Sequence, residues 1–391
     1  MDFIKEAKQL LKQNVRDYGM YIALAVIMLI FTLGTGGLFI SSRNISNLIN
    51  QTGYIAVLSV GMTLVIVIRH IDLSVGYVAG FLGAVIAILL TKYGTPVPVA
   101  ILVALILGLL IGLFNGYLIA NVGIPAFVAT LAGMLVFRGA LLLATEGTGT
   151  IIIPNESFNA IGNGFIPDIA NIKGVHLLTL IIGACTILFY IYSEYKTRKN
   201  KLKYNFEVIS KQMFILKLIF ISLIIGYVTW ILSGYNGLSW TVVIVIIVVL
   251  VYHTITTKTS LGRHIYAVGG NPEAAKLSGI DVSKITLIVF GSMGLLAALS
   301  GILYTARLQS ATTTAGTLFE LDAIAAAYVG GVSAAGGVGK VTGSIVGALV
   351  MASLINGMNL MGVGISYQYI IRGVVLAAAV IFDVKTRNKS R

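Results

Sequence analysis

Long apolar runs separated by shorter polar connectors make up almost the whole chain. The runs are roughly 17 to 23 residues long, and at about 1.5 Å of rise per residue a helix of that length crosses a hydrocarbon core about 30 Å thick. About twelve such runs are predicted. They cover residues 20–39, 53–68, 75–91, 98–120, 126–144, 176–193, 214–232, 238–256, 285–303, 320–337, 340–358 and 366–384. The pattern therefore predicts an all-α fold, a polytopic membrane helical bundle of about 10 to 12 spans in a single transmembrane domain over residues 1–391.

Composition supports a membrane protein. Hydrophobic residues make up 57% of the chain and charged residues only 10%, and the mean hydropathy is +0.96, far from the values of a soluble domain of this length. The first run follows a charged segment and no small-residue cleavage site comes after it, so we expect a retained span rather than a cleaved signal. The single cysteine, Cys185, falls inside an apolar run, which predicts a small buried hydrophobic residue and excludes a disulfide framework.

The positive charges gather in particular connectors. The net charge is +13, and most of the cations lie at the two termini and in two internal connectors, residues 194–217 and 257–284. Cytoplasmic connectors of membrane proteins are enriched in lysine and arginine. With both termini in the cytoplasm, all four basic regions fall on that side and residues 145–175 lie outside. The sequence thus predicts a multi-pass protein of the bacterial cytoplasmic (inner) membrane, without a nucleic-acid partner, because apolar spans separate the basic clusters.

Two distant stretches of the chain resemble each other. Each contains Asn-Gly followed, after the same interval, by Val-Gly-Ile, at residues 115–124 and at residues 356–365. An acidic residue lies upstream of each, Asp72 before the first and Asp322 before the second. Because the paired spans run in opposite directions in the predicted topology, the pattern is typical of an inverted-topology repeat with the pathway between its halves.

Segments 69–80 and 320–340 join a charged residue to glycine-rich apolar sequence, as discontinuous transporter helices do. An unpaired ionisable group is costly in a membrane, so such residues pair, lie at a span end or face a water-filled path. We expect broken helices here, close to the path. Asp72 also fits a second, compatible role as the N-cap of a helix beginning near residue 74. The candidate pathway residues are Asp72, Ser74, Asn115, Phe127, Asp322 and Asn356.

Nothing in the chain indicates an enzyme. The histidines are scattered, and neither a nucleophile elbow nor a zinc-binding helix motif occurs. The glycines at 330–339 lack the lysine and hydroxyl residue that complete a phosphate-binding loop. We therefore expect no catalytic residues, no metal site and no cofactor bound by this chain.

The connector at 257–284 encodes a short capped helix. Asn271 can cap it, and Pro272 suits its first position. Glu273 favours the positive N-terminus, and Gly279 can end the helix in a left-handed conformation. Small residues on one side would let this helix sit in the groove of a partner. An ordinary capped loop helix is the alternative that these residues alone leave open.

The same segment resembles a known motif. Glu273-Ala274-Ala275 followed by Gly279 resembles the EAA-x-x-x-G coupling motif of ABC importer permeases. Further stretches agree with it: Gly61-Met62, Ile71-Asp72-Leu73-Ser74-Val75-Gly76, residues 125–134, Phe137-Arg138-Gly139, and the glycines from Gly331 to Gly339. Together they resemble the ribose/xylose branch of monosaccharide ABC permeases over nearly the whole chain, and the length is most similar to its xylose or multiple-monosaccharide members. Residues 194–235 match no motif of that branch.

This resemblance implies a permease dimer, expected to be a homodimer in membrane lipid, that moves a monosaccharide by alternating access. Xylose or a related pentose or hexose is the expected cargo. An extracytoplasmic sugar-binding protein would deliver the sugar, and a cytoplasmic ABC ATPase would use the ATP and Mg²⁺ that this chain does not bind. The residues implied in ATPase coupling are Asn271, Pro272, Glu273, Ala274, Ala275, Lys276, Ser278 and Gly279.

Two other classes remain open from the sequence. An ion-coupled secondary transporter also fits about twelve spans with inverted repeats, and it would need no partner proteins. A membrane-embedded enzyme would need a nucleophile-base or metal constellation, which the sequence does not offer. ATP-dependent uptake would favour the importer, and turnover of a lipid or peptide by the purified chain would favour the enzyme.

Overall fold

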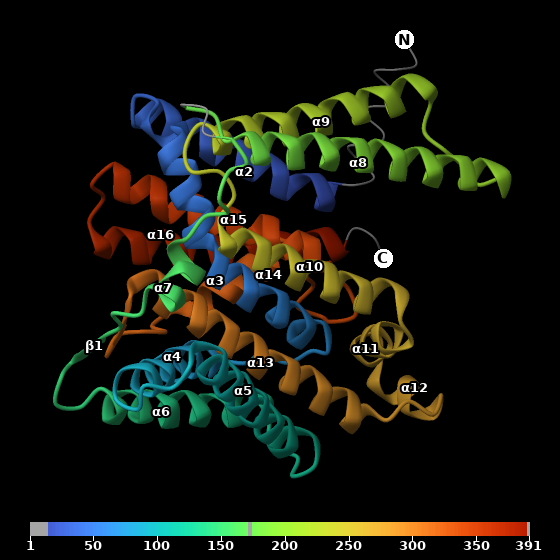
Figure 1. Ribbon diagram of the computed structural model, residues 1–391. Coiled ribbons are helices and arrows are strands. Elements are labelled where there is room, and N and C mark those ends of the chain that lie inside the picture. The colour runs from blue at the N-terminus through green and yellow to red at the C-terminus, as the bar shows by residue number, and fades with distance from the viewer. Residues whose placement is uncertain (1–14, 171–173, 389–391) are drawn as a thin grey trace.

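The computed structural model describes residues 15–170 and 174–388, and these residues are almost entirely helical (Figure 1). The long helices are α2 (Val15–Gly34), α3 (Ser42–Val67), α4 (Val75–Thr91), α5 (Val97–Ala120), α6 (Ala126–Ala144), α8 (Leu177–Lys203), α9 (Lys211–Ser233), α10 (Trp240–Lys258), α13 (Val282–Leu308), α15 (Val341–Leu360) and α16 (Ile365–Asn388). The short elements are η1 (Leu38–Ile40), α7 (Glu156–Asn163), α11 (Ser260–Gly270), α12 (Pro272–Leu277), α14 (Phe319–Val329), and the strands β1 (Thr150–Ile152) and β2 (Ser310–Thr312).

Every predicted apolar run falls on a helix, and the runs 75–91 and 126–144 coincide with α4 and α6 to the residue. Among the described residues, nine helices are long and apolar enough to span a membrane, and the apolar helices Gly19–Gly34 and Val75–Thr91 are shorter. The prediction of an all-α polytopic membrane bundle is confirmed.

One predicted span is a half-length helix. The run 320–337 forms α14, which has 11 residues and is followed by a loop up to α15. A helix of that length covers only about half of a hydrocarbon core. The loop contains left-handed glycines, Gly331, Gly336 and Gly337, with φ of 87°, 78° and 72°, and a regular helix does not continue through such a conformation. The predicted break is therefore present, but the full-length span is not.

The other predicted break separates α3 from α4. Residues 68–74 are not helical, and Arg69 adopts a left-handed backbone conformation with a φ of 67°. The chain turns there and approaches α4 through a short irregular stretch that contains Asp72. Both segments predicted to be discontinuous thus interrupt helices in the structure.

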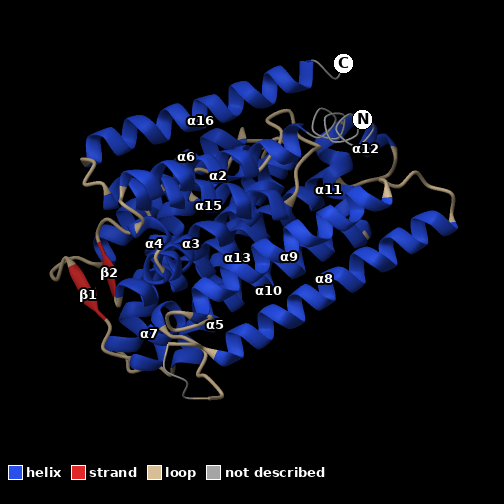
Figure 2. Ribbon diagram, turned by 90° about the horizontal axis from the view of Figure 1, so that it is seen from above, coloured by secondary structure: helices blue, strands red, loops and turns tan. Residues whose placement is uncertain are grey.

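Helices α3, α13 and α15 form the interior of the bundle. In their most apolar stretches 83%, 72% and 72% of the residues are buried, compared with 11% in α8, 11% in α9 and 6% in α16. Glycines allow the closest packing inside: a Cβ on Gly294 of α13 would lie 2.1 Å from the carbonyl oxygen of Gly108 in α5. The exposed apolar helices form the periphery, with α8 and α16 on opposite flanks (Figure 2). Such a surface is suited to lipid.

Cys185 departs from its predicted environment. Its side chain is exposed on α8, so the expected burial within the protein is wrong. The apolar run around Cys185 belongs to a helix that faces outward from the bundle, with 11% of its most apolar stretch buried. Hydropathy alone does not distinguish these two surroundings.

The two ends of the bundle carry different elements (Figures 1 and 2). At one end β1 pairs antiparallel with β2, and α7 packs against α13. At the opposite end α11 and α12 connect α10 to α13. The connector between α8 and α9 lies at this second end (Figure 1). The basic segment predicted at 194–217 is helical except for residues 204–210.

The repeat suggested by the sequence has a structural counterpart. At the end of α5 the N–H of Val122 donates to the carbonyl of Tyr117 at 3.2 Å, and at the end of α15 the N–H of Val363 donates to Met358 at 2.9 Å. The two bonds occupy equivalent positions in the two copies. The end of α5 contacts the start of α13, beside α12, whereas the end of α15 packs near the end of α2 at the other side of the bundle. The paired helices therefore run in opposite directions, as an inverted repeat requires.

Candidate functional sites: the α12 surface and the broken-helix segments

Helix α12 has the caps that its sequence predicts. The side-chain oxygen of Asn271 accepts a hydrogen bond from the N–H of Ala274 at 3.1 Å, and Pro272 occupies the first turn. Glu273 lies in that turn, where its carboxylate favours the positive helix end. Gly279 follows the helix with a φ of 82°, and the N–H of Ile280 closes on the carbonyl of Ala275 at 3.0 Å. These caps bound a helix of six residues.

Most side chains of α12 point away from the bundle. Ala275 is the buried residue of the helix, whereas Leu277 is 90% exposed. The other predicted coupling residues are exposed or half-buried: Asn271, Pro272, Glu273, Ala274, Lys276, Ser278 and Gly279. The helix thus presents one large apolar side chain, that of Leu277, with the charged side chains of Glu273 and Lys276 nearby, at one end of the bundle.

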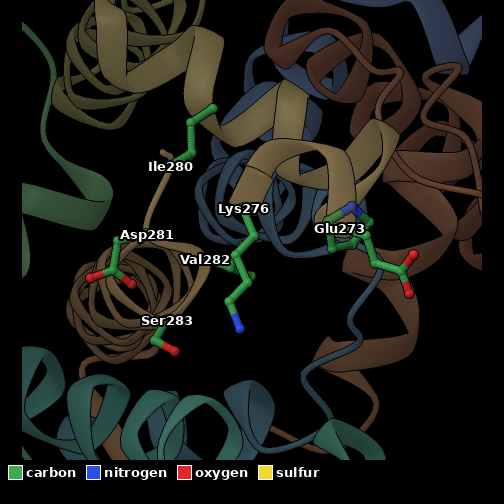
Figure 3. A pocket seen from close by; sticks show the side chains of 7 residues that line it. Glu273, Lys276, Ile280, Asp281, Val282 and Ser283 are labelled. Carbon is green, nitrogen blue, oxygen red and sulfur yellow. The ribbon is translucent and has the colours of Figure 1, made fainter. Parts of the chain in front are cut away.

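A shallow groove of about 450 Å³ runs beside α12 (Figure 3). Its lining comes from α12 and from the start of α13: Pro272, Glu273, Lys276, Ile280, Asp281, Val282 and Ser283. The carboxylate of Asp281 caps α13 by accepting from the N–H of Lys284 at 2.9 Å, and the hydroxyl of Ser283 donates to the carbonyl of Ala120 at 3.2 Å. The groove therefore lies where α12 meets the start of α13, beside the end of α5.

Three of the predicted pathway residues lie together in the bundle. The carboxylate oxygen Oδ1 of Asp72 accepts from the N–H of Ser74 at 2.9 Å and from its hydroxyl at 2.6 Å. The amide of Asn115, on α5, donates to the same hydroxyl at 3.1 Å. All three side chains are buried. The predicted cap at Asp72 thus binds the backbone just before α4 rather than an N–H inside the helix.

The other three predicted pathway residues lie elsewhere. Asp322, buried on α14, accepts from Arg372 of α16 at 3.4 Å. Asn356 exchanges hydrogen bonds with Asn44 at 2.9 and 3.1 Å. Phe127 is 58% exposed on the outside of α6. The structure therefore separates the six candidates into one connected group, two paired residues and one surface residue.

An aromatic cluster near these segments was not predicted. The rings of Tyr54, Tyr304 and Phe319 are 4.7 to 5.1 Å apart, centroid to centroid, and they join α3, α13 and α14. In the sequence Tyr54 lies inside an apolar run, whereas Tyr304 and Phe319 lie at the edges of two others, and no spacing connects the three. Only a signal of contact between distant positions could have identified the cluster.

Within residues 15–170 and 174–388, histidine, cysteine and acidic side chains form no group of three or more that could hold a metal ion.

Outside the spans, the N–H groups of Leu178, Leu177 and Ile169, together with His176, lower the pKa of Asp168 despite an opposing effect of partial burial. Asp168 therefore holds the start of α8 as a carboxylate.

Known proteins resemble this chain over nearly its full length. It is 40% identical over 377 residues to the xylose transport system permease protein XylH of Haemophilus influenzae, a match that covers 96% of this chain and 98% of the relative. It is 36% identical over 362 residues to the ribose import permease protein RbsC of Escherichia coli strain K12, a match that covers 93% of this chain and 91% of that protein. It is 33% identical over 372 residues to the ribose import permease protein RbsC of Bacillus subtilis, a match that covers 95% of this chain and 94% of that protein. No solved structure gives a significant match.

A family model agrees with these relatives. The model described as the branched-chain amino acid transport system permease component matches residues 44–380, a range that runs from the first turn of α3 into α16. The chain therefore belongs to this family of transport permeases and is a multi-pass permease subunit of the inner membrane rather than an enzyme.

Proposed function

We propose that this chain is the membrane permease of an ATP-driven importer for xylose or a related pentose or hexose. The observation that carries the proposal is the α12 surface, an outward-facing capped helix with the EAA-x-x-x-G spacing. The relatives with full-length similarity are named as xylose and ribose permeases. A monosaccharide is therefore our preferred cargo, although the family bears the name of amino-acid systems.

The importer would consist of this chain, an ABC ATPase and a sugar-binding protein. Two copies of the chain would form a homodimer in the lipid bilayer, and each copy would present one α12 to the ATPase. ATP and Mg²⁺ would bind to the ATPase, not to this chain. In the docked state Glu273 and Lys276 would contact polar groups of the ATPase, while Leu277 would fill an apolar pocket.

The end of the bundle that carries α12 would face the cytoplasm. Lysine and arginine residues gather in the α8–α9 connector and in the segment from α10 to α13, and both lie at that end. This bias follows the rule for cytoplasmic connectors. Both termini would then be cytoplasmic, and the strands β1 and β2 would face the binding protein outside.

The broken-helix segments would gate the sugar path. The polar groups of Asp72, Ser74 and Asn115 are engaged with one another, so we assign them to holding and releasing the start of α4 rather than to direct sugar contact. The Asp322–Arg372 pair would hold α14 against α16 in the same way. Switching between inward-open and outward-open states would break or re-form these contacts.

Uptake measurements with a panel of labelled compounds test this function. Cells without their own pentose and hexose importers would express the chain with its ATPase and binding protein, and xylose, ribose, glucose and leucine would be offered at equal concentration. We expect saturable uptake of a pentose or hexose that stops when the nucleotide-binding lysine of the ATPase is replaced. Uptake that persists with the inactive ATPase would support an ion-coupled transporter instead, and uptake of leucine alone would contradict the sugar assignment.

A further inference from the structure

The last residues of α11 are held by an arginine from the end of α3. The Nε of Arg69 donates to the carbonyl of Gly269 at 2.7 Å, and its Nη2 donates to the carbonyl of Gly270. Gly270 is followed by Asn271, the cap of α12. The guanidinium thus binds two successive backbone carbonyls immediately before the coupling helix.

The loop after α14 meets the same point. The N–H of Gly337 donates to the carbonyl of Val67 at 2.8 Å, and the hydroxyl of Tyr266 on α11 donates to the carbonyl of Gly339 at 2.6 Å. The backbones touch: a Cβ on Gly269 would lie 1.9 Å from the Val67 oxygen and 2.7 Å from the Gly337 nitrogen. Three segments far apart in the sequence therefore share one backbone contact, which leaves no room for them to slide independently.

Each of these segments leads to a feature already described. Val67 ends α3, and Arg69 lies in the irregular stretch that contains Asp72. Gly337 and Gly339 lie in the loop between α14 and α15. The helix α12 follows α11 directly. One junction thus links the α12 surface to both broken-helix segments.

We propose that Arg69 is the positioning residue of a coupling junction, defined as Arg69, Tyr266, Gly269, Gly270 and Gly337, which moves as one unit and transmits the displacement of α12 to both broken-helix segments. The inference rests on the proposed function, because it assigns the route by which an ATPase docked at α12 would act on the path.

The chemistry of the contact requires arginine. A guanidinium offers several N–H donors in a fixed plane, so it can bind two carbonyls at once, whereas a lysine ammonium is a single point on a flexible chain. The backbone of Arg69 is left-handed, with a φ of 67°, a conformation that persists in a non-glycine residue only when its surroundings hold it. Replacement by lysine should keep the positive charge but loosen the link between α3 and α11.

The test compares sugar transport with ATP consumption in the same reconstituted complex of permease, ATPase and binding protein. We expect Arg69→Lys to lower the amount of sugar moved per ATP hydrolysed by about tenfold, a usual size for coupling between sites. Tyr266→Phe removes one hydroxyl and should lower this amount by about threefold, as loss of a single hydrogen bond would.

The matched control is Arg198→Lys. Arg198 also donates to a backbone carbonyl, that of Ile209 at 2.7 Å, but in the α8–α9 hairpin. Its ratio should remain that of the wild type.

The ratio separates coupling from simple stability. A purely structural Arg69 would lower transport and hydrolysis in proportion, with the ratio unchanged, and that result would overturn the proposal. If Arg69→Lys is not recovered in the membrane, the ratio of Tyr266→Phe decides alone. Suppose that Glu273→Lys uncouples the complex, whereas Arg69→Lys and Tyr266→Phe both keep the wild-type amount of sugar moved per ATP hydrolysed. That result would reject the coupling junction but not the proposed function. The absence of ATP-driven uptake by the wild-type complex would reject both.

Discussion

The carboxylate of Asp72 shows which contacts could be anticipated from single residues. Its bonds to Ser74 at 2.9 and 2.6 Å join residues two positions apart, so a local cap was a natural prediction. Asn115 was predicted from the repeat pattern, and its amide does donate to the hydroxyl of Ser74, which in turn donates to Asp72. Phe127 came from a motif, but a motif does not say which face of its helix a residue occupies, and Phe127 lies on the outer one. The partners of Arg69 lie 200 and 201 positions away, beyond the reach of local patterns.

Asparagine at position 72 should slow transport without removing the protein. Asp72→Asn keeps one oxygen to accept from Ser74 but places an amide N–H₂ in a buried site. We expect the initial rate of sugar uptake to fall by about fivefold, because an unsatisfied buried donor costs on the order of 1 kcal/mol in one of the states. Uptake is measured against the amount of protein in the membrane. Wild-type uptake at equal abundance would leave only the local capping role.

The Asp322–Arg372 pair invites a double-mutant cycle. Asp322→Asn and Arg372→Gln each leave one partner of a partly buried ion pair alone, so each single variant should reduce uptake relative to its abundance. The double variant should lose less than the two single losses combined, because neither uncompensated charge remains. Losses that simply add would show that the 3.4 Å contact does not act as a pair during transport.

At the scale of elements, the sequence predicted where helices lie better than how far they extend. The boundaries of α4 and α6 matched because charged residues, prolines or glycines bound those runs. The run 320–337 is nearly as apolar as a span, yet left-handed glycines end α14 early. Hydropathy measures compatibility with lipid, whereas the end of a helix depends on backbone conformation. The prediction of a broken helix at 320–340 was therefore correct, while the prediction of a full span at 320–337 was not.

Exposed positions of α12 should control coupling, and Ala274 tests this best because a larger residue there would not disturb the fold. Ala274 is exposed, whereas Ala275 is buried, so a bulky residue at Ala275 would also strain the fold. We expect Ala274→Leu and Glu273→Lys to lower uptake at least about tenfold with normal membrane insertion, because each obstructs the fit of the helix into a groove. The control is Ala184→Leu, the same substitution at an exposed position of α8. Normal uptake and normal ATPase co-purification in both α12 variants would remove the coupling role.

At the scale of the whole molecule, charge should determine orientation. We expect single cysteines placed at Lys201 and Lys276, in a Cys185→Ala background, to resist an impermeant thiol reagent in intact cells and to react in inside-out vesicles. A cysteine at Glu146, an exposed residue beyond α6, should show the opposite pattern. Labelling of Lys201→Cys and Lys276→Cys from outside would overturn the proposed orientation.

The overall architecture could be predicted from the sequence, whereas the contacts between distant residues inside the bundle could not. Apolar length, basic connectors and one repeat pattern were sufficient for an all-α bundle with inverted halves, since each of these signals is local or periodic. The packing of Gly108 on Gly294, the cluster of Tyr54 with Tyr304 and Phe319, and the coupling junction all join distant segments. Residues of the same types also occur in lipid-facing helices, so their identity alone does not reveal such contacts.

The central claim is that ATP hydrolysis by a partner drives sugar through this chain by way of α12. The most direct measurement is uptake of labelled sugar into liposomes that contain the purified permease and ATPase, with ATP on the ATPase side and the loaded binding protein on the other. We expect the wild-type permease to give ATP-dependent accumulation of sugar against a gradient, and the Glu273→Lys permease to allow ATP hydrolysis without accumulation. Accumulation that is independent of ATP, or that Glu273→Lys leaves unchanged, would contradict it.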